Sequence, residues 1–191
     1  EKLDKYYIAS HHDIDPENID YLEYEFSDIP NIIEGDANEY NELLQFLKSN
    51  DLSIEENFQY AANKIDIDEV INYLCAEIYC DNVNWPSTNS RWWKEKSAGG
   101  KWRYVMLDFD YGFGTPGYYS TYSHNNIDLA LNTYNAPFNT VFVSLFQNES
   151  FKNMFIQRFA HYLNSIFSVD RVASIVDSCK NMISNEMLNH I

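Results

Sequence analysis

The chain of 191 residues has few cysteines, glycines and prolines (3, 6 and 5), and only 13 Lys and Arg against 29 Asp and Glu. Three cysteines are too few for a disulfide scaffold, and they show no zinc-ligand spacing with the five histidines. The formal charge of −16 excludes a general nucleic-acid-binding protein, which needs a basic face for phosphates. No apolar run reaches the ~18 residues of a membrane-spanning helix, so no membrane span is expected.

Aromatic residues, by contrast, are abundant, with 15 Tyr, 12 Phe and 4 Trp. A chain of this length can bury roughly 70% of its unfolded surface, so this supply is ample for the core of one domain covering residues 1–191. The charge is uneven: residues 1–80 carry 20 acidic and 4 basic side chains, whereas residues 81–191 carry nine of each. The simplest interpretation of the acidic half is a solvated surface that favours solubility.

The first 80 residues divide into two parts. Residues 1–35 are irregular, with short strands expected at 6–10 and 21–26. Residues 36–80 have helical periodicity. Three N-terminal capping patterns support this interpretation, each with an acidic residue three positions after the cap: Asp36, Ser53 and Asp66.

The remaining residues indicate a loop region followed by a helical bundle. Residues 81–135 contain two polar loops around an expected β-hairpin, whose turn is Ser97-Ala98-Gly99-Gly100 and whose second strand covers 101–108. Residues 136–191 predict three helices, at 137–147, 150–167 and 169–190. The expected fold class is α+β, mostly helical with a small hairpin at the loops.

Two polar clusters interrupt otherwise apolar sequence and suggest the functional site. One spans residues 81–89 and the other spans residues 108–114. Magnesium held on nucleotide phosphates takes one or two carboxylate or amide ligands from the protein. An amide at the end of one loop and a carboxylate at the end of a strand, joined by a hairpin, supply such a pair.

The spacing within these clusters matches a phosphotransferase pattern. In kinase catalytic loops a base Asp is followed five residues later by a metal-binding Asn, and then by a strand that ends in a metal-binding Asp. Here Asn84 and Asn89 are five apart, and Asp108 follows nineteen residues later. Either half of the pattern alone occurs often by chance, and their order around a hairpin makes the combination moderately specific.

These motifs resemble the spore-coat protein H (CotH) kinase-like family. The resemblance covers roughly residues 36–191 and depends on two strings, Asn84-Trp85-Pro86-x-x-Asn89 and Asp108-Phe109-Asp110-Tyr111-Gly112-Phe113-Gly114. The intervening Gly99-Gly100-Lys101-Trp102-Arg103, the helix at 67–79 and the segment at 151–164 support it. The family is similar to atypical protein kinases that use ATP and magnesium to phosphorylate secreted proteins.

The resemblance assigns roles to individual residues. Asn89 and Asp108 correspond to the metal-binding amide and carboxylate, and Asp110 is a second candidate ligand, so these three would also bind the cofactor. Asn84 occupies the catalytic position where the family usually has Asp, and an amide cannot accept the proton of a substrate hydroxyl. The chain also lacks a Gly-rich phosphate loop. We therefore expect a catalytic-loop lobe whose nucleotide-clamping lobe lies upstream and is missing here.

Two functions follow from these observations. The first is a secreted or surface protein kinase lobe that transfers phosphate from Mg-ATP to Ser or Thr of extracellular or coat proteins. The second is a non-catalytic pseudokinase, or a binding module of a surface or cellulosome assembly. The expected cofactors are Mg²⁺ and ATP. The expected partners are a protein substrate and the upstream lobe, and the location implied by the resemblance is the cell or spore surface.

Structural explanations compete with these assignments. The Asp and Asn residues of both clusters also fit ordinary turns that hydrogen-bond to their own backbone. The three hairpin tryptophans, Trp92, Trp93 and Trp102, fit a core better than a sugar-stacking platform. The basic residues of the hairpin fit a solvated surface or, alternatively, a phosphate-steering patch; they are Arg91, Lys94, Lys96, Lys101 and Arg103.

Overall fold

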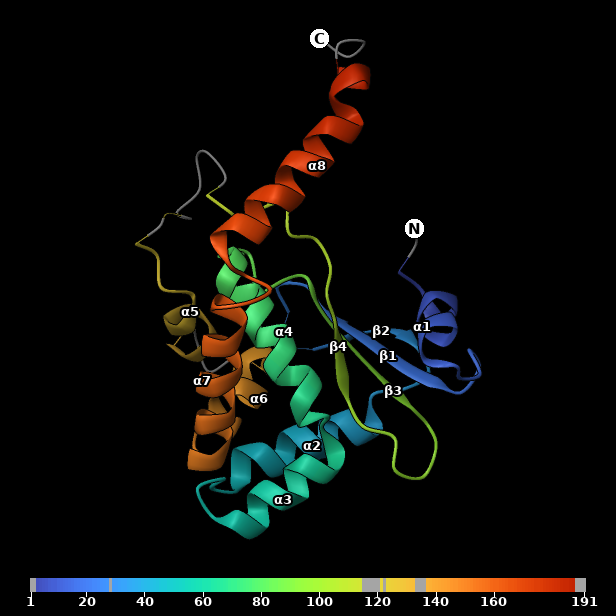
Figure 1. Cartoon of the computed structure of the whole chain (residues 1–191). Coiled ribbons are helices and arrows are strands. Elements are labelled where there is room, and N and C mark those ends of the chain that lie inside the picture. The colour runs from blue at the N-terminus through green and yellow to red at the C-terminus, as the bar shows by residue number, and fades with distance from the viewer. Residues whose placement is uncertain (1–2, 28, 115–120, 122, 133–136, 188–191) are drawn as a thin grey trace.

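A computed structural model of the chain describes residues 3–27, 29–114, 121, 123–132 and 137–187, and Figure 1 shows its mostly helical α+β fold. The elements of the N-terminal half are α1 (Lys5–His12), β1 (Ile19–Tyr24), β2 (Asn31–Glu34), α2 (Asn38–Ser49), α3 (Glu55–Lys64) and α4 (Ile67–Cys80). Those of the C-terminal half are β3 (Ser90–Glu95), β4 (Arg103–Val105), α5 (Asn126–Asn132), α6 (Pro137–Leu145), α7 (Glu149–Leu163) and α8 (Val169–Met187).

The strands form one antiparallel sheet in the order β2-β1-β3-β4. The expected hairpin is confirmed as β3 and β4, with Arg91 opposite Val105, but it is half of a larger sheet that also includes β1 and β2. Strand β4 ends at Val105, three residues before Asp108. The two candidate loops, residues 81–89 and 108–114, therefore lie at the open end of the β3–β4 hairpin.

Neighbouring residues of β3 face two separate cores. Trp92 belongs to the large core that α2, α4 and α6 also form, whereas Trp93 belongs to the smaller core under α1. This alternation follows from the two-residue period of a strand. All three hairpin tryptophans are buried, so their interpretation as core residues is confirmed.

Helix α4 is attached to β4 at its first residues. The Asp66 carboxylate accepts a hydrogen bond from the Glu69 N–H at 3.4 Å and caps the helix, as its sequence pattern predicts. The same carboxylate pairs with the Arg103 guanidinium at 2.8 Å. The backbone N–H of Asp66 also donates to the Trp102 carbonyl at 3.0 Å. The start of α4 is thus fixed to the hairpin by two contacts, with Arg103 and with Trp102.

Replacing Asp66 with alanine is expected to destabilise the protein by about 1–2 kcal/mol, because a helix cap and a half-exposed ion pair are lost together. Asp66→Asn keeps the capping oxygen and should cost about 0.5 kcal/mol. Urea unfolding of both variants tests this expectation. Equal losses of stability in the two variants would show that the ion pair with Arg103, and not the helix cap, accounts for most of the effect.

The basic residues of the hairpin pair with acidic residues of the N-terminal half. The four ion pairs are Arg91–Glu23 at 2.5 Å, Lys94–Glu39 at 2.7 Å, Lys96–Asp20 at 3.5 Å and Arg103–Asp66 at 2.8 Å. The Lys101 ammonium donates to the Ala62 carbonyl at 2.7 Å. The interpretation of this cluster as a solvated hairpin is therefore wrong, because all five cations make polar contacts with residues of the N-terminal half.

Two local predictions also fail. The segment 6–10 is helical and not a strand, because Asp4 caps the N–H groups of Tyr6 and Tyr7 and the helix buries Ile8 and Ala9. Ser53 does not cap α3, whose N-cap is Ile54. Within the loop region expected at 81–135, residues 126–132 form helix α5, and residues 115–120, 122 and 133–135 lie outside the described part, as does residue 136.

The three C-terminal helices match their predicted positions as α6, α7 and α8. Among the described residues, none of the helices combines the length and the apolarity that a membrane crossing requires.

Candidate active site

The first candidate loop leaves α4 through a left-handed residue and is anchored by a tryptophan. Asp81 ends the helix with φ 53°, and its N–H donates to carbonyls of the last helical turn. Trp85 is fully buried, with its indole 6.0 Å from the Tyr73 ring and 5.3 Å from the Phe142 ring between centroids. The Trp85–Pro86 peptide bond is cis. Packing of Trp85 therefore fixes the middle of the loop.

Asn84 is held within this loop by its backbone. Its carbonyl accepts hydrogen bonds from the Thr88 N–H at 3.2 Å and from the Ser87 hydroxyl at 3.1 Å. Its side-chain oxygen is shielded from solvent, and it has no hydrogen-bond partner within the described residues. The family resemblance expects the catalytic base at this position. The structure has there an amide oxygen that is buried and has no hydrogen-bond partner among the described residues.

Asn89 and Asp108 come together at the open end of the hairpin. The Asn89 side-chain nitrogen lies 3.5 Å from the Asp108 carbonyl oxygen. Both residues have left-handed backbone conformations, with φ 54° and 53°, which Asn and Asp tolerate better than most residues. The β3–β4 register places them nearly opposite each other, so the two loops meet here, and the contact involves the backbone of Asp108. That the two side chains bind one metal ion stays a prediction.

Asp110 lies next to Asp108. Desolvation, a hydrogen bond to the Asp108 carboxyl group and the Asp108 charge raise the pKa of the Asp110 carboxyl group. Both side chains are exposed. Two adjacent carboxylates and one amide at a hairpin end form an oxygen-rich donor set that suits Mg²⁺. Among the described residues there is no cluster of three or more His, Cys, Asp or Glu side chains that could hold a metal without further ligands.

The second candidate loop, residues 108–114, closes against the end of α4. The Phe113 N–H donates to the Cys80 carbonyl at 2.6 Å, and the Gly112 N–H donates to the Phe109 carbonyl at 3.0 Å. A β-carbon on Gly112 would lie 2.9 Å from the Cys80 carbonyl oxygen, so only glycine fits without a backbone shift.

A buried polar cluster lies beneath both loops. Glu77 is fully buried, and its Oε2 accepts a hydrogen bond from the Asn82 amide at 3.0 Å. The same amide lies 3.3 Å from the Asp108 carbonyl. The buried Asn126 side chain donates to the carbonyls of Glu77 and Asn82, at 3.2 and 3.3 Å. Glu77 thus supports the backbone of both candidate loops through Asn82.

Burial dominates the ionisation of Glu77. It raises the pKa of this carboxyl group from 4.5 to about 8, although hydrogen bonds with Asn82 and Tyr73 oppose the shift. The second oxygen, Oε1, accepts no hydrogen bond in the described part of the chain. Near neutral pH the protonated form is therefore favoured.

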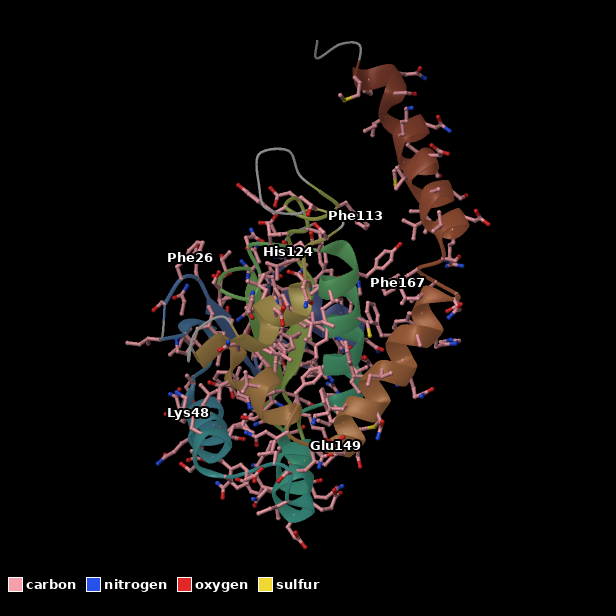
Figure 2. All side chains as sticks on the ribbon, turned by 90° about the vertical axis from the view of Figure 1, so that its left-hand side faces the viewer. Phe26, Lys48, Phe113, His124, Glu149 and Phe167 are labelled. Atoms are coloured by element: carbon pink, nitrogen blue, oxygen red, sulfur yellow. The ribbon has the colours of Figure 1, made fainter. Side chains whose placement is uncertain are left out.

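His124 adds a contact at the same end of the molecule, where Figure 2 also shows Phe113. Its Nδ1 lies 2.5 Å from the Asp81 carboxylate, and both side chains are partly buried.

Sequence reasoning missed the supporting residues Glu77, Asn82 and Asn126. One signal was available for Glu77: it lies three and seven positions after the apolar residues Leu74 and Val70, on the buried face of α4. An acidic residue at a core position is a reason to expect a buried polar partner. No comparable pattern marks Asn126, which reaches the site only through the tertiary fold.

The chain matches a known protein family. The family model described as CotH kinase protein matches residues 3–191. Neither a curated protein nor a solved structure matches the chain. Because the match covers nearly the whole length, the chain belongs to the CotH kinase protein family.

Proposed function

We propose that this chain supplies the catalytic loop and the metal loop of a protein kinase that transfers the γ-phosphate of Mg-ATP to Ser or Thr of a protein substrate. The observation that supports it is the convergence of Asn89, Asp108 and Asp110 at the open end of the β3–β4 hairpin. The substrate, by this proposal, is a coat or extracellular protein at the cell or spore surface. By the same proposal, a lobe outside residues 1–191 also clamps the nucleotide.

The residues fit the roles that a magnesium ion and a nucleotide require. Asn89, Asp108 and Asp110 would hold the metal with oxygen atoms, and bound Mg²⁺ supplies charge neutralisation for the phosphates. The buried Glu77–Asn82 pair positions the Asp108 backbone, so that the metal loop is ordered before any ligand binds. Preorganisation of this kind is the main contribution of a protein to phosphoryl transfer.

Asn84 favours a second function, a pseudokinase or surface binding module without transfer activity. A carboxylate in this position would accept the proton of the substrate hydroxyl, and an amide cannot. A chain with an intact metal site and a disabled base binds nucleotide without turnover. The two functions share the metal site and differ only in the chemistry at residue 84.

Replacing Asp108 with alanine is expected to abolish Mg²⁺-dependent nucleotide binding. Titration calorimetry with MgATP, on a chain extended upstream of Glu1, measures the effect, and ATP with EDTA serves as the metal-free reference. Asp170→Ala removes an equal charge from an exposed position on α8 and should bind like the parent. Unchanged MgATP binding by Asp108→Ala would refute the assignment, and absence of binding by the parent would refute both functions.

A further inference from the structure

Helix α8 has no buried residue. It extends away from the rest of the molecule in both views (Figures 1 and 2). Only its start is fixed: Phe167, just before the helix, stacks on Tyr79 of α4 with ring centroids 4.3 Å apart and contacts Tyr162 at 5.5 Å. An isolated helix of 19 residues is only marginally stable in water, so contacts with another surface are needed to stabilise α8.

One face of α8 is apolar and exposed. The side chains on it recur mainly at the seven-residue spacing, two helical turns, of a single helix face. Their exposed fractions run from 49% to 81%, far above those of core residues, for Val169, Ile175, Val176, Met182, Ile183 and Met187. We call these six residues the α8 apolar face. An exposed apolar stripe of this kind marks an interaction surface.

The charges of α8 indicate which surface covers this face. Asp177 and Lys180 lie equally far on either side of the point between Ser178 and Cys179, and Arg171 and Glu186 also lie equally far from that point. A two-fold axis through it would bring each of these residues level with a residue of the other sign in a second, antiparallel copy. Asp177 lies three residues after Ser174 on the opposite face of α8, so only Arg171 and Glu186 can pair across the contact.

A parallel arrangement is less favourable for two reasons. It sets equal residues at equal heights, so that each charge lies level with its own copy. It also places both globular bodies at the same end, because each body is attached to the N-terminal end of α8 (Figure 1). The antiparallel arrangement puts the two bodies at opposite ends of the helix pair, where they do not collide.

We infer that the α8 apolar face binds the same face of a second copy of this chain, in an antiparallel pair centred between Ser178 and Cys179. In this register Ile175 packs opposite Met182 of the second copy. Arg171 then faces Glu186 of the second copy, and the symmetry repeats each contact. The inference does not depend on nucleotide binding or on phosphoryl transfer.

Analytical ultracentrifugation across micromolar concentrations tests this arrangement. The parent should show a monomer–dimer equilibrium, because five helical turns bury a small interface. Val176→Asp should abolish the dimer by placing a charge on the apolar face, whereas Ser174→Asp, on the opposite face, should leave it intact. Neither change should unfold the body, because α8 buries nothing, and circular dichroism checks this.

Charge reversal tests the register. Arg171→Glu and Glu186→Arg should each weaken the dimer about three- to tenfold at low salt, since each dimer contains two such pairs. The double variant should restore the parent affinity, because only the antiparallel register brings these positions together. A parent that stays monomeric, or a dimer that survives Val176→Asp, would overturn the inference. A double variant that fails to recover would overturn the antiparallel register.

Discussion

Replacing Glu77 with glutamine is expected to make the protein more stable than the parent at pH 9 and about equally stable at pH 5. The buried carboxyl group has its pKa raised from 4.5 to about 8, so folding favours its protonated form. Between these two pH values the parent loses up to about 1.4 kcal/mol of stability per pH unit, because the unfolded chain ionises more readily. Glutamine keeps the acceptor for Asn82 and does not ionise.

The direction of this effect is the opposite of that for a salt-bridged carboxylate. The folded pKa lies above the unfolded value, so the penalty is absent below about pH 4.5, grows as the pH rises, and is complete above about pH 8. Urea unfolding of parent and variant at pH 5, 7 and 9 gives the difference directly. The variant should gain a few kcal/mol relative to the parent between the lowest and the highest pH.

Glu69→Gln provides the matched control, since it removes the same charge from an exposed position on the same helix. Its stability should stay within about 0.5 kcal/mol of the parent. A Glu77→Gln difference that does not vary with pH would mean that Glu77 is solvated in the folded protein. The buried support beneath the two loops would then need another explanation.

Replacing Asn84 with aspartate is expected to raise the rate of phosphate transfer by 10²–10⁴-fold, roughly the contribution of a positioned general base. The change exchanges an amide for a carboxylate of nearly equal shape, so the loop that Trp85 anchors should persist. The Asn84 side-chain oxygen has no hydrogen-bond partner in the described residues, so the substitution removes no contact that the oxygen makes there.

Transfer of radiolabelled γ-phosphate from ATP to casein, by the chain extended upstream of Glu1, measures this gain. Asn84→Ala controls for loss of the amide alone and should match the parent. The double variant with Asp108→Ala should be inactive, because the metal site fails. No gain in Asn84→Asp, with MgATP binding intact, would favour the non-catalytic function.

Much of the fold can be predicted from local sequence. Helix α4 follows from the Asp66 cap and its apolar stripe, and the hairpin follows from two aromatic strands around the Gly-Gly turn. The union of that hairpin with β1 and β2 is not visible locally, because strand pairing between distant segments leaves no short-range pattern. The strand expected at 6–10 fails because a helix cap at Asp4 outweighs the β-propensity of Tyr and Ile.

The candidate site likewise has one part that the sequence predicts and one part that it does not. The convergence of Asn89 and Asp108 is predictable, since a hairpin brings together the residues that flank it. Asp110 follows because it is two residues away in the same loop. The support by Glu77, Asn82 and Asn126 is not predictable as a unit, because three separate segments supply it and only the packed structure shows that they meet. The ion pairs between the basic hairpin and residues 1–80 are likewise not predictable from local sequence.

That pairing has a consequence for the order of events on the ribosome. Strand β1 lies in the middle of the sheet, and its partner β3 is made about 70 residues later, together with the cations that neutralise Glu23, Glu39 and Asp20. Until the hairpin leaves the exit tunnel, β1 has only β2 as a neighbouring strand, and Glu23, Glu39 and Asp20 lack the cations that pair with them in the folded protein. Contacts this distant in sequence form slowly. The central β1–β3 pairing of the sheet therefore has to follow synthesis of the hairpin, and residues 1–80 carry 20 acidic and 4 basic side chains until its cations emerge.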